Sequence, residues 1–143
     1  MAETLGVNLG ERSYVIHFGH DLSAGVRGEV DRLVAAGRRV VVLTDANVVR
    51  AQSSCLGAMF GAAPTLTIEA GESSKSLVGL GRVLDFLAEQ KVDRGGVLFA
   101  VGGGVIGDLA GFAAAAWLRG IEFYQVPTTL LAMVDSSVGG VDG

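Results

Sequence analysis

Four glycines in seven residues open the stretch VGGGVIGDLAGFAAAAW at positions 101–117. Three of them, Gly102, Gly104 and Gly107, satisfy the pattern G-x-G-x-x-G. Between a strand and a helix, such a turn leaves room for a ligand beside free N–H groups and the positive end of the helix dipole, which suits a pyrophosphate. In the standard dinucleotide fingerprint an acid ends the next strand, whereas Glu122 begins one here. We interpret the turn as an anion site, with ordinary turn geometry as the alternative.

One acid, Asp108, follows that turn, and no other charged residue lies between Arg94 and Arg119. The helix that begins here is apolar on nearly every side, so we expect it to be buried, with Asp108 in its first turn. A buried carboxylate without a partner is strongly destabilising. Either a bound ligand supplies hydrogen-bond donors to Asp108, or the side chain reaches water and only complements the helix dipole.

Other polar residues follow expected strands. Asp45 and Asn47 come directly after an apolar run, where either could cap the next helix or Asp45 could accept hydrogen bonds from ribose hydroxyls. Glu72 and Lys75 flank the start of a helix. A cation in a first turn opposes the helix dipole, so Lys75 needs a negative partner, which is either Glu72 or a bound phosphate or ribose system.

The remaining polar candidates are weaker. Thr128 follows Pro127 and could simply cap a helix. Asp135 lies near the end of an apolar helix, where an acid is unfavourable unless it has a partner. His17 and His20 are three residues apart without a third ligand, so we expect them to belong to the scaffold and predict no metal site in the chain.

Alternating strands and helices must position these residues. The hydrophobic periodicity predicts strands at 14–19, 38–45, 64–70, 96–101 and 121–126. It predicts helices at 21–37, 47–61, 73–91 and 105–118, and the start of another at 128–137. This order indicates an α/β fold with a parallel, Rossmann-like sheet in three layers, helices covering both faces. Such sheets bind ligands at the carboxyl ends of their strands, where the candidate residues lie.

Composition narrows the class of protein. The 143 residues suit one domain spanning 1–143, and half of them are hydrophobic, which is enough for a core. A net charge of −4 without a Lys/Arg cluster argues against a nucleic-acid surface. The apolar region 95–118 contains Asp108 and many glycines, so we expect no membrane span. A single cysteine, Cys55, favours a reduced, cytoplasmic setting.

The order of motifs resembles a known family. The segments LGERSY, VLTDANV, EAGESSK, GGGVIGDLAGFAAAAWLRGI and QVPTTLLAMVDSSVGG together are similar to the N-terminal part of the 3-dehydroquinate synthases, over essentially the whole chain. The resemblance implies a dinucleotide-binding domain that binds NAD, followed by a mainly helical domain that carries a divalent metal, zinc or cobalt. It implies conversion of 3-deoxy-D-arabino-heptulosonate 7-phosphate to 3-dehydroquinate and phosphate in the shikimate pathway, by an enzyme that is a homodimer when full-length.

The same resemblance assigns expected roles to residues. It places Asp45 on the adenosine ribose, Asp108 on the nicotinamide portion and Asp135 on a substrate hydroxyl. The other cofactor contacts that it implies are Glu72, Lys75, Gly103, Gly104, Val105, Thr128, Thr129 and Leu131.

Two departures limit what we expect of this chain. Val141 and Asp142 stand where the family pattern has Lys and Thr, so a binding lysine is missing. The family's C-terminal metal and substrate domain is also absent from the sequence, so we expect weak NAD binding and no turnover by this chain alone. Two alternatives remain open: a metal-dependent polyol dehydrogenase of the glycerol dehydrogenase type, and a non-catalytic nucleotide-binding module.

Overall fold

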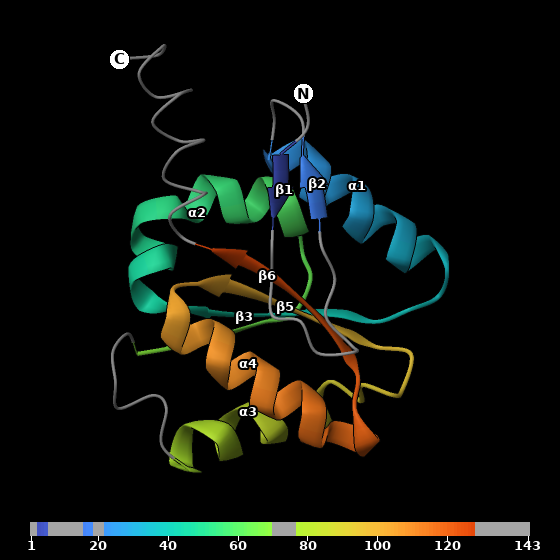
Figure 1. The fold of residues 1–143 in the computed structure, drawn as a ribbon, viewed down its shortest axis with the longest axis vertical. Helices are drawn as coiled ribbons and strands as arrows, with labels where there is room; N and C mark the ends of the chain where they lie inside the picture. The colour runs from blue at the N-terminus through green and yellow to red at the C-terminus, as the bar shows by residue number, and fades with distance from the viewer. Residues whose placement is uncertain (1–2, 6–15, 19–21, 70–76, 128–143) are drawn as a thin grey trace.

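The computed structural model describes residues 3–5, 16–18, 22–69 and 77–127 (Figure 1). Its centre is a four-stranded, wholly parallel sheet in the order β4-β3-β5-β6. The strands are β3 (Val40–Asp45), β4 (Thr65–Ile68), β5 (Val97–Gly102) and β6 (Glu122–Pro127). The helices are α1 (Leu22–Ala35), α2 (Ala46–Phe60), α3 (Leu77–Glu89) and α4 (Gly104–Ala116), the last followed by a short 3₁₀ turn, η2 (Trp117–Arg119).

Helices cover both faces of this sheet, as the sequence predicts. Figure 1 shows α1 and α2 on one side and α3 and α4 on the other. The side chains along each strand alternate between the two faces of the sheet, because successive residues of a strand point in opposite directions. In β3, Val40 and Val42 pack with α1 and α2, whereas Val41 and Leu43 pack with α3 and α4. The expected three-layer α/β fold is therefore confirmed.

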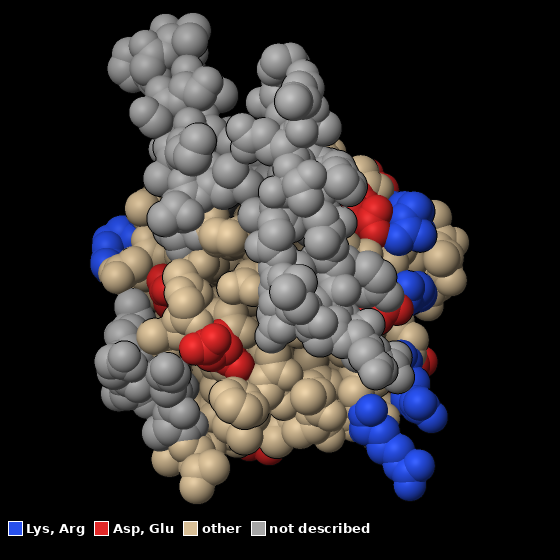
Figure 2. All heavy atoms as spheres, in the orientation of Figure 1, with Lys and Arg blue, Asp and Glu red and all other residues tan. Residues whose placement is uncertain are grey.

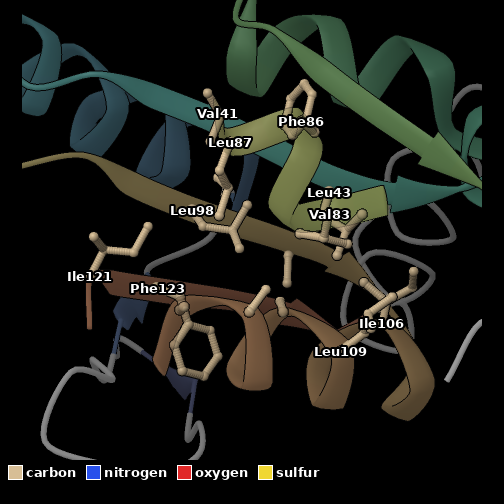
Figure 3. Packing of buried hydrophobic residues seen from close by; sticks show 14 of the residues in the cluster. Val41, Leu43, Val83, Phe86, Leu87, Leu98, Ile106, Leu109, Ile121 and Phe123 are labelled. Carbon is tan, nitrogen blue, oxygen red and sulfur yellow. The ribbon is translucent and has the colours of Figure 1, made fainter. Parts of the chain in front are cut away.

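Each face has its own apolar core. On the α1/α2 side, Phe99 stacks on Tyr124 with ring centroids 4.6 Å apart and meets Phe60 edge-on at 5.3 Å. On the other side, aliphatic residues of β3 and β5 pack against α3 and α4 (Figure 3). β3 and β5 are buried along their whole length, which explains their continuous apolar sequences.

Two helices end in the same hydrogen-bonded motif. After α1, the N–H of Gly37 donates to Val34 O (2.9 Å) and that of Arg38 to Leu33 O (3.0 Å). After α3, the N–H of Lys91 donates to Ala88 O (3.0 Å) and that of Val92 to Leu87 O (3.0 Å). Both are Schellman caps, whose central residue adopts a left-handed backbone. Gly37 has φ +80° and Lys91 has φ +55°, so one cap uses glycine and the other a lysine.

Several boundaries differ from the sequence prediction. The helix predicted at 105–118 ends at Ala116, because Leu118 (φ 50°) and Arg119 (φ 71°) are left-handed. The helix predicted to reach residue 91 ends at Glu89. An antiparallel pair, β1 (Glu3–Leu5) with β2 (Ile16–Phe18), adds a strand that the sequence pattern does not predict. The helix expected at 128–137 lies outside the described residues.

Polar contacts tie the beginnings of the strands together. Arg38, just before β3, donates through Nε to Gly95 O (2.7 Å) and pairs through Nη2 with Glu122 at the start of β6. The Trp117 indole donates to Val92 O (2.9 Å), which joins the end of α4 to the segment before β5. Among the described residues, no helix is both long enough and apolar enough to cross a membrane.

Candidate functional site

The four strands of the parallel sheet end at one level. Asp45 of β3 pairs with Ile68 of β4, and Gly102 of β5 pairs with Pro127 of β6. Thr44 pairs with Val101, so Asp45 and Gly102 are next to each other in the register. We call this row, with the turns that follow it, the carboxyl edge. The fold thus brings Asp45 and the glycine turn to one side of the sheet, although 57 residues separate them in sequence.

The chain reverses its direction across the sheet at this place. After β3 it moves outward to β4, and it then returns past β3 to form β5 and β6. The helix after β3 packs on one face and the helix after β5 on the other. The ends of β3 and β5 therefore flank a topological switch point, the usual ligand position in open α/β sheets.

Thr44 joins the two central strands immediately before this switch point. Its hydroxyl donates to Val101 O (2.7 Å), and the residue is wholly buried. The sequence prediction overlooks it, although a lone hydroxyl in the apolar run VVVLTD was a visible signal. A buried hydroxyl is normally hydrogen-bonded, so Thr44 stabilises the β3–β5 pairing where the site needs it.

At two of the turn's glycines a side chain would meet neighbouring atoms. A Cβ on Gly102 would lie 2.8 Å from Ile106 Cγ1 and 2.9 Å from its Cβ. A Cβ on Gly107 would lie 2.1 Å from Gln125 Nε2, because α4 crosses β6 closely there. Such contacts are far inside the normal separation of about 3.5 to 4.0 Å.

The other two glycines of the turn face open space. A Cβ on Gly103 or on Gly104 would meet nothing within 4 Å among the described residues, and neither residue has a positive φ. Gly103 is the N-cap of α4 and, having no side chain, makes no side-chain capping bond. The first N–H groups of a helix have no partner within it, and no side chain at Gly103 or Gly104 obstructs an approach to them. A phosphate group fits this arrangement in size and charge.

Asp45 caps α2 at the same edge. Its Oδ1 accepts a hydrogen bond from the N–H of Val48 (2.9 Å), and the residue is only 9% exposed. The capping role left open by the sequence is thus present. A carboxylate has two oxygens and several acceptor positions, so capping by Oδ1 leaves Asp45 able to accept from a ligand hydroxyl as well.

Asp108 differs from its prediction in two respects. It is exposed, not buried, and it is the fifth residue of α4, one turn beyond the first. The reason is that α4 packs on the sheet through only part of its surface, although almost all its residues are apolar. The side that bears Asp108 also bears Phe112, which is 68% exposed. Val105 is half-buried next to the open turn.

The remaining predicted site residues lie outside the part of the chain that the structure describes. They are Glu72, Lys75, Thr128, Thr129, Leu131 and Asp135. Strands β4 and β6 end at Ile68 and Pro127, so the chain enters both segments from the carboxyl edge. Within the described residues, no group of three or more His, Cys, Asp or Glu side chains is arranged to hold a metal ion.

A separate polar cluster links α1 to β6. The Tyr124 hydroxyl donates to Glu29 Oε2 (2.6 Å), and Arg32 Nε donates to Glu29 Oε1 (3.1 Å). The hydrogen bond from Arg32, more than that from Tyr124, lowers the pKa of Glu29 below its usual value. Burial, followed by the bond to Glu29, raises the pKa of Tyr124. Because the cluster lies within the α1/α2 side of the sheet, we assign it to stability.

Comparison with known proteins places the chain in a family. The family model "3-dehydroquinate synthase N-terminal" matches residues 65–143, which include the glycine turn, Asp108 and the segment after β6. The chain belongs to the 3-dehydroquinate synthase N-terminal family. The expected resemblance is therefore confirmed, and the 3-dehydroquinate synthase family is favoured over the polyol dehydrogenases of the glycerol dehydrogenase type.

The curated relatives of this chain are longer than the chain itself. The 3-dehydroquinate synthase of Opitutus terrae is 64% identical over 143 residues, which are all of this chain and 40% of the relative. The chain thus spans about 40% of the length of that curated relative.

Two solved structures show the same fold. A 2-deoxy-scyllo-inosose synthase superposes with a TM-score of 0.63 at 23% identity, over 95% of this chain and 38% of that one. ValA, a 2-epi-5-epi-valiolone synthase of Streptomyces hygroscopicus solved with NAD⁺ and Zn²⁺ bound, gives 0.57 at 27% identity, over 72% of this chain and 31% of that one.

Proposed function

We propose that this chain binds NAD at the carboxyl edge and forms the dinucleotide-binding domain, residues 1–143, of a 3-dehydroquinate synthase. The open space at Gly103 and Gly104 carries the proposal. Nothing among the described residues requires glycine at either position, whereas a pyrophosphate lying on the N-terminus of α4 does. The family match and the NAD⁺ in the related ValA structure support this occupant.

Each described site residue then has a distinct task. The first N–H groups of α4, at Gly104 and Val105, hold the pyrophosphate, and Gly103 lets it approach. Asp45, across the switch point, accepts from the adenosine ribose while it caps α2. Asp108 lies one turn along α4 and meets the nicotinamide portion, where its exposure makes it accessible to the ligand.

Residues outside the described part complete the proposed site. We assign Glu72, Lys75, Thr128, Thr129 and Leu131 to the cofactor and Asp135 to a substrate hydroxyl. Bound NAD supplies reversible hydride transfer, which lets 3-deoxy-D-arabino-heptulosonate 7-phosphate lose phosphate on the way to 3-dehydroquinate.

The full reaction needs more than the described residues provide. The described residues contain no cluster suited to zinc or cobalt. We propose that the metal ligands and the other substrate-binding residues belong to a further domain of the whole protein. We propose that the whole enzyme is a cytoplasmic homodimer. We expect this chain alone to bind NAD weakly and not to turn over substrate, because it would supply only one of the two domains between which NAD binds.

Titration calorimetry with NAD tests the cofactor site. Gly104→Val should leave the fold intact, since its Cβ meets nothing within 4 Å among the described residues, yet it should weaken NAD binding about tenfold or more by displacing the phosphate from charge-assisted N–H bonds. Gly81→Ala is the matched control, because Gly81 also has nothing within 4 Å but lies in α3. Equal NAD affinity in Gly104→Val and the unaltered chain would refute the site.

A second measurement separates the enzyme from a non-catalytic module. Phosphate release from the heptulosonate phosphate should be absent with this chain and present with the whole protein. Turnover by the chain alone would contradict the proposed division of the site. NAD binding without any turnover by the whole protein would favour the module.

A further inference from the structure

Helix α2 is broken part-way along its length. Gln52 has φ −131° and ψ 28°, which are not helical values, although it lies inside a helix of 15 residues. Figure 1 shows α2 changing direction after its first turns. Sharp bends in helices usually arise at proline or glycine, and residues 47–56 contain neither. The local sequence therefore does not impose the break.

The apolar pattern of α2 would suit an unbroken helix. Val48 and Met59 are buried, and Leu56 is partly buried against the same core. Gln52 lies four residues after Val48 and four before Leu56, so it belongs to the same helical stripe. This spacing predicts one continuous helix, and the break departs from it.

The side chain of Gln52 is unusual as well. Its amide oxygen is buried without a hydrogen-bond partner among the described residues. A buried acceptor that is left unsatisfied destabilises a protein, whereas an apolar side chain of similar shape does not. Gln52 thus combines a non-helical backbone with an unsatisfied amide, and departures of this kind concentrate at functional sites.

The two halves of α2 are anchored to different parts of the fold. Before the break, Asp45 at the end of β3 accepts a hydrogen bond from the N–H of Val48 (2.9 Å), which is itself buried. After the break, Met59 and Phe60 are buried in the core, where Phe60 meets Phe99 edge-on. In an unbroken helix the second half would dictate the direction of the first. The break lets the first turn of α2 follow the end of β3 instead.

The direction of Asp45 matters because few charged groups lie near it. Figure 2 shows the described Lys and Arg side chains gathered on the right-hand side, where Figure 1 shows β5 and β6 beginning. Few charged side chains are visible on the left-hand side, where these strands end. Hydrogen bonds to a carboxylate weaken steeply with misalignment, so a small rotation of the first turn of α2 would lose a contact made by Asp45.

We infer that the break at Gln52 directs Asp45 toward the adenosine ribose of NAD, which makes Gln52 a positioning residue for the cofactor. This inference rests on the proposed function. The break and the buried amide both lower stability, and they set the direction of the first turn of α2. Removing them should therefore stabilise the protein and weaken its binding of NAD.

Gln52→Met tests the inference, because methionine is a good helix former of similar shape without an amide oxygen. We expect the Cα chemical shift of residue 52 to become helical and the Tm to rise by about 3 to 6 °C. Titration calorimetry should show NAD binding weakened about three- to tenfold, as for partial loss of a charge-assisted hydrogen bond.

Gly57→Ala is the matched control. Gly57 lies in α2 after the break, and a Cβ there would meet nothing within 4 Å. Alanine favours a helix over glycine, so this variant should also raise the Tm. It should leave the affinity for NAD unchanged, because it does not alter the break.

A double-mutant cycle shows whether Gln52 acts through Asp45. In an Asp45→Ala background, Gln52→Met should cause no further loss of NAD affinity, because the group that it positions is already gone. Additive losses would overturn the inference.

Two other results would also overturn it. The first is equal NAD affinity in Gln52→Met and Gly57→Ala. The second is a non-helical Cα shift at residue 52 in Gln52→Met, which would show that Gln52 does not maintain the break. These results would leave the proposed function intact, whereas an unaltered protein that binds no NAD would refute both.

Discussion

Adding one methyl group to each glycine of the β5–α4 turn separates the glycines that packing requires from those that a ligand requires. Gly102→Ala places its Cβ 2.8 Å from Ile106 Cγ1, and that branched side chain has few other rotamers on a helix. Overpacking of this kind costs about 1 to 3 kcal/mol. Gly107→Ala meets the amide end of Gln125, which can rotate, so about 1 kcal/mol is expected.

Gly103→Ala and Gly104→Ala should behave in the opposite way. Neither new methyl meets another atom within 4 Å among the described residues. At Gly104, inside α4, alanine favours the helix over glycine by up to about 1 kcal/mol, whereas at the N-cap Gly103 glycine is preferred to alanine. Thermal unfolding should therefore lower the Tm by about 3 to 10 °C for Gly102→Ala, leave it unchanged or raised for Gly104→Ala, and lower it only slightly for Gly103→Ala. Equal destabilisation at all four positions would refute the reasoning, because it would show that packing alone requires every glycine.

Four further predictions concern stability. Tyr124→Phe removes the bond to Glu29 and should lower the free energy of unfolding by about 1 kcal/mol at pH 7, measured by urea denaturation. Because the pKa of Tyr124 is raised, its contribution is fully present below about pH 10 and declines as the pH rises from there through the higher folded-state pKa, so the unaltered protein should lose more stability than the variant at strongly alkaline pH. Because the pKa of Glu29 is lowered, its contribution to stability is present above about pH 4.5 and is lost as the pH falls through the folded-state pKa. If a Glu29→Gln variant loses stability at acidic pH in the same way as the unaltered protein, this interpretation is contradicted. Lys91→Gly should raise the Tm by about 2 to 4 °C by relieving the left-handed lysine, whereas Gly37→Ala should lower it, and the same sign for both would argue against strain. Asp45→Ala should cost about 1 kcal/mol through loss of the α2 cap, and an unchanged urea midpoint would show that the cap is dispensable.

The sequence predicts the layers of this fold well because the buried strands leave an unambiguous pattern. β3 and β5 are buried at every residue, and short, continuous apolar runs such as theirs are typical of strands covered on both faces. Helix ends are predicted less well. The left-handed residues Leu118 and Arg119 end α4 early without glycine at either position, so no local signal marks the turn.

The candidate site is predictable only in part. The glycine turn and Asp45 can be recognised from the sequence, because glycines and an acid directly follow predicted strands. The exposure of Asp108 cannot be predicted in the same way, because an apolar helix sequence does not indicate which side of the helix packs on the sheet and which side stays exposed. The different roles of Gly102 and Gly103 are equally invisible in sequence, since they depend on how close Ile106 lies.

The position of Trp117 provides a natural optical probe. It is the chain's single tryptophan, and its indole is hydrogen-bonded to Val92 O at the edge where the strands begin. A coenzyme bound at the far end of α4 cannot touch this ring. A shift of the tryptophan emission maximum upon adding oxidised NAD, after correction for the coenzyme's own absorption, would therefore report a rearrangement transmitted along the helix, and an unchanged maximum would indicate a rigid helix.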